Sequence, residues 1–182
     1  MKTKVLVLIG KSGSGKDTIS KLLPYNKVVR YTTRPKRDNE TDGIDYNFLE
    51  SIPSDWIMND EWLELVKYND WVYLTRIDSL KEGEINVICT DPQSADQIYM
   101  SCLDLGYDFI CFNLIVPDKT RLQRQLSREE NPNCHEICRR YLAEEKDYDL
   151  DSLSFKPFPL LNINIEKTIN FIKSFMKEKE VC

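Results

Sequence analysis

The sequence lacks several features that would place it in a broad class of protein. Its 25 basic residues are outnumbered by 30 acidic ones, which gives a formal net charge of −5. A general nucleic-acid binder needs a net basic surface, so the composition argues against that class and leaves room only for a local phosphate pocket. No apolar run approaches the roughly 20 residues of a membrane span, which argues against insertion into a membrane.

A secretory signal is also missing near Met1. The first apolar run, Val5–Ile9, is too short for a signal-peptide core, and no small-residue cleavage site follows it. We therefore expect a cytoplasmic protein. In that compartment its six cysteines (89, 102, 111, 134, 138 and 182) should be reduced thiols.

The cysteines give little support for a metal site. Cys134, His135 and Cys138 have no second ligand pair at a matching spacing, so we expect them on a surface helix. Cys89 and Cys111 lie inside apolar runs and are expected to be small core residues.

Short apolar runs alternate with helical patterns along most of the chain. The expected strands are Val5–Ile9, Ile85–Cys89, Phe109–Val116 and, with a weaker signal, Pro159–Ile163. The expected helices are Asp17–Leu23, about Ser94–Leu105, about Lys119–Arg128, about His135–Lys146, and a last one with Ile165, Ile169, Ile172 and Met176 on one face. This alternation predicts an α/β fold with an open parallel sheet flanked by helices.

The segment 32–80 breaks this alternation. A polar loop, Arg34–Asp42, precedes three aromatic-rich runs: Tyr46–Leu49, Trp62–Tyr68 and Trp71–Thr75. Asn69-Asp70, between the last two runs, predicts a hairpin turn. With no internal repeat or long linker, the chain is expected to form a single domain. Its core would be 1–31 and 81–182, and 32–80 would be a small mixed α+β insertion.

A phosphate-binding loop follows the first expected strand. The residues with the spacing of a P-loop are Gly10, Lys11, Ser12, Gly13, Ser14, Gly15, Lys16, Asp17 and Thr18. Glycines let backbone N–H groups turn inward around phosphate oxygens, Lys16 adds a cation, and the next helix adds its positive end. Asp17 stands where a hydroxyl usually helps to hold Mg²⁺. It could act on the metal through water, stabilise the helix start, or repel phosphate.

Two further motifs follow the P-loop at a specific spacing. The first is Thr32-Thr33-Arg34-Pro35-Lys36-Arg37, and the second is Asp42-Gly43-Ile44-Asp45-Tyr46-Asn47-Phe48. Taken alone, the arginines would be a solvated basic cluster. Together with the flanking pattern, the chain resembles the guanylate kinase family, and related features continue to its C-terminal end.

The resemblance implies a GMP site within the insertion. Arg34 and Arg37 stand where the family holds the monophosphate, and a guanidinium fork suits phosphate geometry. The positions whose hydroxyls complete that grip are Tyr46 and Tyr73. Glu64 matches the carboxylate that reads guanine, because it can accept hydrogen bonds from N1–H and the 2-amino group. Thr75 and Asp91 match a base-contacting serine and a second acidic residue near the base.

Other positions depart from the family pattern or match it less closely. Arg30 replaces a serine that contacts guanine, and it could donate to O6 and N7 or reshape the base pocket. Cys89 replaces an acidic residue near Mg²⁺. The resemblance places Arg128 and Arg140 in a lid at about 128–140 over the ATP phosphates. Two weaker matches are Arg139, in the same segment, and Asn162, at a position that lies near the adenine in the family.

The reaction implied by the resemblance is ATP + GMP ⇌ ADP + GDP, with Mg²⁺ as cofactor and dGMP as a possible second acceptor. Lys16, Arg37, Arg140 and Arg128 would carry the transfer. Phosphoryl transfer needs alignment and charge stabilisation more than a covalent nucleophile, which suits a chain with one histidine. The implied partners are small nucleotides, with no nucleic acid and no membrane, in a monomer or homodimer.

Three alternatives stay open at this stage. Gly15-Lys16-Asp17 and Arg30-Tyr31 resemble ribose 1,5-bisphosphate phosphokinases, although a sugar phosphate gives Glu64 no base to read. Another nucleoside or deoxynucleoside monophosphate kinase is compatible with the same fold. A non-catalytic guanylate-kinase-like binding module is a third alternative, which the complete P-loop disfavours.

Overall fold

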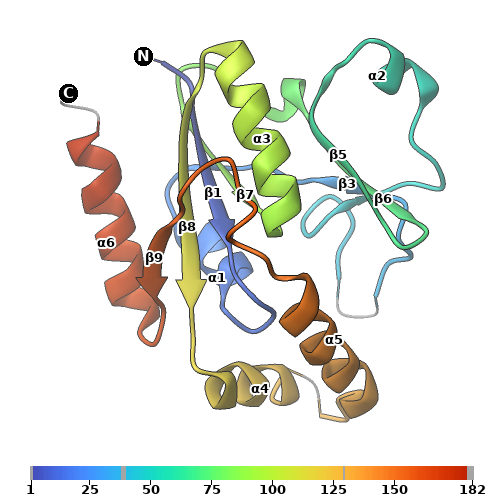
Figure 1. Ribbon diagram of the computed structural model, residues 1–182, viewed down its shortest axis with the longest axis vertical. Coiled ribbons are helices and arrows are strands. Elements are labelled where there is room, and N and C mark those ends of the chain that lie inside the picture. Colours follow the sequence, from blue (N-terminus) through green and yellow to red (C-terminus); the bar gives the residue numbers. More distant parts are fainter. Residues whose placement is uncertain (1, 38–39, 129, 180–182) are drawn as a thin grey trace. The chain divides into compact units, whose positions relative to one another are not determined.

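The computed structural model describes residues 2–37, 40–128 and 130–179 (Figure 1). Its strands are β1 (Lys4–Ile9), β2 (Asn26–Lys27), β3 (Tyr31–Thr32), β4 (Asn47–Phe48), β5 (Trp62–Tyr68), β6 (Trp71–Arg76), β7 (Ile85–Cys89), β8 (Asp108–Ile115) and β9 (Phe158–Leu161). Its α-helices are α1 (Lys16–Leu22), α2 (Ser54–Met58), α3 (Pro92–Leu105), α4 (Asp118–Leu126), α5 (Cys134–Asp147) and α6 (Ile165–Glu178), and a short 3-10 turn covers Ile77–Ser79.

The larger sheet has the strand order β2-β7-β1-β8-β9. The pairs β2/β7 and β8/β9 are parallel, and Phe112 lies opposite Phe158 in the second pair. Every residue of β1 is buried, as expected for a continuous apolar run that is covered on both faces. The predicted α/β class with a parallel sheet and flanking helices is confirmed.

The smaller sheet has the order β4-β3-β6-β5. β5 and β6 form the predicted antiparallel hairpin, with Tyr68 opposite Trp71 at the turn. Asn69 adopts a positive φ of 53° there, a conformation that asparagine tolerates better than most residues. The register shifts between Trp62 and Glu64, after which Glu64 lies directly opposite Thr75. This register brings two of the predicted base-contacting residues together.

The chain divides into two compact units. The first comprises Met1–Val7, Tyr25–Ile88 and Gln93–Ile110, and the second comprises Leu8–Pro24, Cys89–Pro92 and Cys111–Cys182. The first unit contains the β5–β6 hairpin, and the second contains the predicted P-loop.

Aromatic packing organises the core of the second unit. The Phe112 ring on β8 lies 5.8 Å from that of Phe158 on β9 and 5.2 Å from that of Phe175 on α6. Figure 1 shows α6 running beside β9. Ile172 and Met176 are fully buried on the predicted apolar face of this helix. The face predicted from its spacing is thus confirmed.

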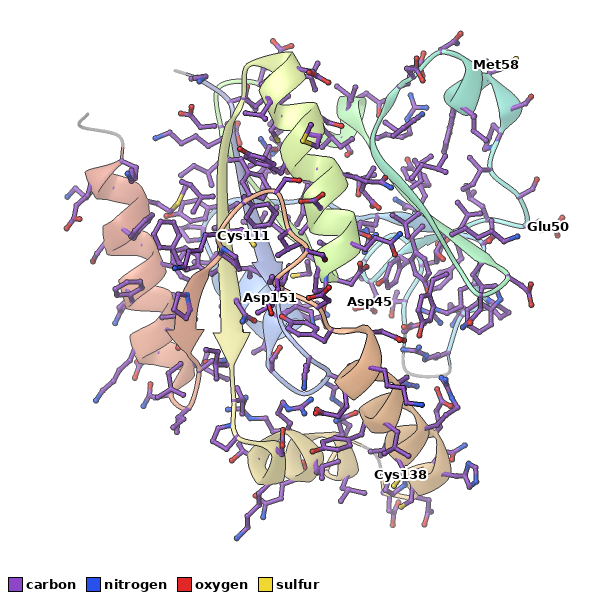
Figure 2. All side chains as sticks on the ribbon, in the orientation of Figure 1. Asp45, Glu50, Met58, Cys111, Cys138 and Asp151 are labelled. Atoms are coloured by element: carbon purple, nitrogen blue, oxygen red, sulfur yellow. The ribbon has the colours of Figure 1, made fainter. Side chains whose placement is uncertain are left out.

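No disulfide joins the cysteines that the structure describes, and Cys182 lies outside the described residues. Cys111 is buried on β8, whereas Cys138 is exposed on α5 (Figure 2). Cys89, expected in the core, is only half-buried at the end of β7. Among the described residues, no helix is both long and apolar enough to cross a bilayer.

Candidate functional site

The predicted phosphate loop connects β1, which ends at Ile9, to α1, which begins at Lys16. Gly13 and Gly15 have φ values of 80° and 92°, in the left-handed region that side chains rarely adopt. A Cβ at Gly13 would lie 2.6 Å from the carbonyl oxygen of Arg121 on α4. Glycine is therefore required there both by backbone conformation and by close packing.

Polar groups of the loop itself suit an anion. The Lys16 ammonium donates to the carbonyl of Gly10 and is thus folded over the loop. The Ser14 hydroxyl is buried and has no hydrogen-bond partner among the described residues. Asp17 and Thr18 lie exposed in the first turn of α1. The loop has the conformation and the cation that phosphate binding requires.

Two helices hold Ser12 of the loop by both of its backbone polar groups. Glu144 on α5 accepts a hydrogen bond from the Ser12 N–H at 2.7 Å, and Arg121 on α4 donates to the Ser12 carbonyl at 3.2 Å. Arg121 is only 2% exposed and also forms ion pairs with Glu144 at 3.2 Å and Asp118 at 2.7 Å. Side chains of α4 and α5 therefore hold the backbone of the loop in place.

A second set of contacts involves Asn162, which follows β9. Its fully buried amide donates to the Ser14 carbonyl at 2.7 Å, and its side-chain oxygen accepts from the Thr168 hydroxyl at 3.0 Å. Arg124 on α4 donates to the carbonyls of Gly13 and Asn162. Asn162, predicted near the adenine, thus donates its side-chain amide to the loop backbone.

The predictions from sequence did not include Arg121, Arg124 or Glu144. All three are charged residues on amphipathic helices, where a solvent-exposed position is the usual outcome. The only available signal was the i,i+3 spacing of the two arginines on α4. That spacing places them on one face but does not indicate what the face contacts.

The predicted lid arginines make local contacts. Arg139 and Arg140 both donate to Glu136 on α5, at 2.7 Å from their Nε atoms. The hydrogen bonds from Arg139 and then Arg140 lower the pKa of Glu136 to about 2. Arg128 is exposed beyond the end of α4. Lys11, predicted in the phosphate site, pairs with Glu145 on α5.

In the first unit, the predicted guanine-reading carboxylate is fully buried. Glu64 Oε1 accepts a hydrogen bond from the Thr75 hydroxyl at 2.8 Å and lies 2.8 Å from both Nε and Nη2 of Arg30. Arg30 is only 5% exposed and also donates to the Ser94 hydroxyl at 3.1 Å. Glu64 Oε2 is buried and has no partner among the described residues. A buried charged oxygen without a partner is costly, so its position favours a ligand with a donor group.

Next to this carboxylate lies the predicted monophosphate grip. The Arg34 guanidinium is 5.4 Å from the Tyr46 ring, whose centroid is 6.0 Å from that of Tyr73. Tyr73 in turn lies 5.5 Å from the Arg30 guanidinium. The structure therefore brings these four residues and Glu64 together in one unit.

The arginines of the grip already hold an anion of the chain itself. Arg34 donates to both carboxylate oxygens of Glu40, at 2.8 and 2.9 Å, and Arg37 Nη1 lies 3.5 Å from one of them. Burial alone would raise the pKa of Glu40, but hydrogen bonds from Arg34 and from the Arg37 N–H lower it overall. Glu40 was not predicted from sequence, where it was one of many acidic residues in a polar loop.

Asp91, the second predicted acidic residue, is exposed between β7 and α3 and belongs to the second unit. It accepts a long hydrogen bond of 3.4 Å from the Thr90 hydroxyl. The described residues contain no group of three or more His, Cys, Asp or Glu side chains that could hold a metal ion on their own.

The strand-loop-helix geometry and the half-buried lysine of the loop define a P-loop α/β protein of the class that binds nucleotide phosphates. Comparison with known proteins narrows this class. The sequence model of the family described as guanylate kinase matches residues 2–179, so the chain belongs to the guanylate kinase family.

Individual relatives agree with this assignment. A guanylate kinase of Mycoplasmopsis pulmonis is 29% identical over 169 residues, covering 85% of this chain and 86% of that protein. A guanylate kinase of Syntrophotalea carbinolica is 25% identical over 182 residues, covering 94% and 84%. The crystal structure of guanylate kinase from Anaplasma phagocytophilum matches 98% of this chain and 86% of that chain, with a TM-score of 0.66 and 17% identity. At this identity, the structural match supports the fold alone.

Proposed function

We propose that this chain transfers the γ-phosphoryl group of ATP to the phosphate of GMP. The observation that carries the proposal is the fully buried Glu64 carboxylate, which keeps one oxygen without a partner beside a cluster of arginines and tyrosines. A carboxylate accepts hydrogen bonds from guanine N1–H and 2-NH₂, whereas adenine offers no such donor pair. The family assignment and the complete P-loop agree with this reading.

The P-loop is proposed to bind the ATP phosphates. Backbone N–H groups of the loop and the Lys16 ammonium would stabilise the charge on the β- and γ-phosphates. The buried Ser14 hydroxyl, which has no partner among the described residues, fits a ligand with acceptor oxygens. Lys16 already reaches across the loop to the carbonyl of Gly10, which supports its assignment to the phosphates bound there.

The cluster of Arg34, Arg37, Tyr46 and Tyr73 is proposed to hold the acceptor phosphate. Arg34 and Arg37 bind the Glu40 carboxylate, which supports their capacity to bind an anion with several oxygens. The acceptor phosphate is the nucleophile of the reaction, so the task of these side chains is to orient it in line with the γ-phosphate.

The family implies a magnesium ion, and the residues present fit one that arrives with the nucleotide. Mg²⁺ is typically bound through one or two carboxylates, several waters and substrate phosphates. Asp17, exposed in the first turn of α1, would hold the ion through water. When bound, the ion neutralises charge on the transferring phosphates. Cys89, half-buried, offers no hard oxygen ligand.

We further propose that residues of about 32–80 form the acceptor-binding insertion on a core of 1–31 and 81–182. The segment at about 128–140 would act as a lid over ATP. Arg140 would have to release Glu136, with which it is paired on its own helix, before it could bind a phosphate, and Arg128 would act with it. Closure of such segments excludes water, which would otherwise accept the phosphoryl group.

The test is a coupled ADP-release assay with Mg-ATP and six acceptors: GMP, dGMP, AMP, CMP, UMP and ribose 1,5-bisphosphate. We expect turnover with GMP or dGMP and little with the others. Lys16→Ala should abolish turnover, while Lys21→Ala, an exposed position on the same helix, serves as the matched control. Glu64→Ala should remove the preference for guanine. Turnover of the sugar phosphate or of AMP that Glu64→Ala leaves unchanged would overturn the proposal.

A further inference from the structure

The two oxygens of the Glu64 carboxylate are in unlike surroundings. Oε1 is surrounded by Arg30 Nε, Arg30 Nη2 and the Thr75 hydroxyl, each at 2.8 Å. Oε2 is buried without a partner among the described residues. A carboxylate oxygen accepts about two hydrogen bonds, so Oε1 has no capacity left for a ligand. Only Oε2 can accept from a bound base.

Arg30 is held firmly in this position. Besides Glu64, it donates to Ser94 at 3.1 Å, and its guanidinium lies 5.5 Å from the Tyr73 ring. Both members of the ion pair are buried, with 5% and 0% of their side chains exposed. Separating a buried ion pair leaves an uncompensated charge and is strongly unfavourable. A base that binds beside Glu64 would therefore meet the carboxylate with Arg30 still bound to it.

The donor groups of the purine ring determine which hydrogen bonds a single carboxylate oxygen can accept. A carboxylate with both oxygens open takes guanine N1–H on one and the 2-amino group on the other, as two in-line hydrogen bonds. With Oε2 alone, the ring N1–H takes the in-line position, and the 2-amino group is left at an angle too oblique for a strong hydrogen bond to the same oxygen. The ring N1–H is more acidic than the exocyclic amine, so it makes the stronger bond with a carboxylate. Adenine places an acceptor nitrogen at this position and would be repelled.

We infer that Arg30 is a specificity-determining residue: it occupies Glu64 Oε1, so that the carboxylate does not recognise the 2-amino group of the base. The acceptor class is then the 6-oxopurine nucleoside monophosphates, so that IMP is used nearly as well as GMP. This inference rests on the proposed function, because it concerns the base pocket of the same acceptor site.

The experiment measures the preference for GMP over IMP in two ways: as a ratio of kcat/KM with Mg-ATP, and as a ratio of dissociation constants by calorimetry. The wild-type ratio should be below about tenfold, because the missing 2-amino group costs no hydrogen bond to a charged acceptor. Arg30→Ser should raise both ratios to about 10- to 100-fold, because Oε1 then becomes available for the 2-amino group.

Two further variants keep the experiment interpretable. Arg30→Lys retains a cation that can occupy Oε1, so its ratio should stay near the wild-type value. Arg76→Ser is the matched control: Arg76 lies on the same hairpin, is 11% exposed and forms ion pairs with Glu61 and Asp78. It follows Thr75 on β6, so its side chain projects from the opposite face of the strand. Thermal melts by circular dichroism establish that each variant is folded.

The outcomes separate this inference from the proposed function. A wild-type preference for GMP over IMP of about tenfold or more would overturn the inference and leave the GMP activity standing, and this result needs no variant to fold. An unchanged ratio in a folded Arg30→Ser protein would also overturn it. Equal binding of GMP and IMP without turnover of either would support the inference and refute the proposed function. Binding of neither, or of AMP equally well, would refute both.

Discussion

Replacement of Gly13 by alanine tests how closely the phosphate loop packs against α4. Gly13 and Gly43 have similar positive φ values, 80° and 74°, so alanine imposes a similar backbone strain of about 1–2 kcal/mol at each. At Gly43 a Cβ meets nothing within 4 Å. At Gly13 it lies 2.6 Å from the Arg121 carbonyl oxygen and 3.0 Å from the Arg121 Cα, so the helix backbone must shift. Overpacking of this kind adds about 1–3 kcal/mol.

The expected result is therefore a clear difference between two chemically identical substitutions. Gly43→Ala should lower the free energy of unfolding by about 1–2 kcal/mol, and Gly13→Ala by about 2–5 kcal/mol. Urea denaturation followed by far-ultraviolet circular dichroism measures both. Gly106→Ala is a second control, because Gly106 also has a positive φ and a Cβ there would meet nothing within 4 Å. Equal losses in all three variants would refute the close approach of the loop to α4.

Three other predictions concern titration, anion binding and thiol reactivity. Ionised Glu136 stabilises the folded protein fully above its ordinary pKa near 4.5, and this stabilisation is lost as the pH falls toward the pKa of about 2 in the folded protein. Glu136→Gln should therefore reduce the loss of unfolding free energy between these two pH values, as measured by urea denaturation. Glu40→Gln removes the carboxylate that Arg34 holds, so inorganic phosphate should raise the melting temperature of the variant more than that of the wild type. Burial raises the pKa of Cys102 to about 12, so a thiol reagent should modify exposed Cys138 first and Cys102 only on unfolding, as followed by peptide mass spectrometry.

Each of these expectations has a result that contradicts it. An unchanged acid profile in Glu136→Gln would mean that the two arginines do not stabilise the carboxylate in solution. An equal effect of phosphate on both proteins would show that Glu40 does not compete for the arginine site. Rapid labelling of Cys102 in the folded protein would show that α3, the helix that carries it, opens easily.

The elements that could be predicted from sequence are those with a strong local signal. β1, β7 and β8 consist mainly of apolar residues, and the P-loop glycines are needed for a specific backbone path. The β5–β6 hairpin has aromatic strands on both sides of a turn-forming Asn-Asp pair. By contrast, β2 and β3 have two residues each and α2 has five, which is too short for any periodicity to be visible.

The candidate site divides in the same way. The motif positions identified Glu64 and Arg34, because their roles follow from side-chain chemistry at a given spacing. Sequence could not decide whether Arg30 faces a ligand or the protein, since that depends on which groups the fold places around it. The structure shows Arg30 paired with Glu64. Glu40 and Arg121 were missed for the same reason, because their partners are determined by tertiary packing.

The supports of the phosphate loop have a consequence for biosynthesis. Ser12 is held by Glu144 and Ser14 by Asn162, contacts that span 132 and 148 positions of the chain. The loop is therefore synthesised well before two of the side chains that hold it. Long-range contacts of this kind form late and slow folding. A nascent chain that ends before Glu144 should therefore carry the whole glycine motif and still bind nucleotide poorly.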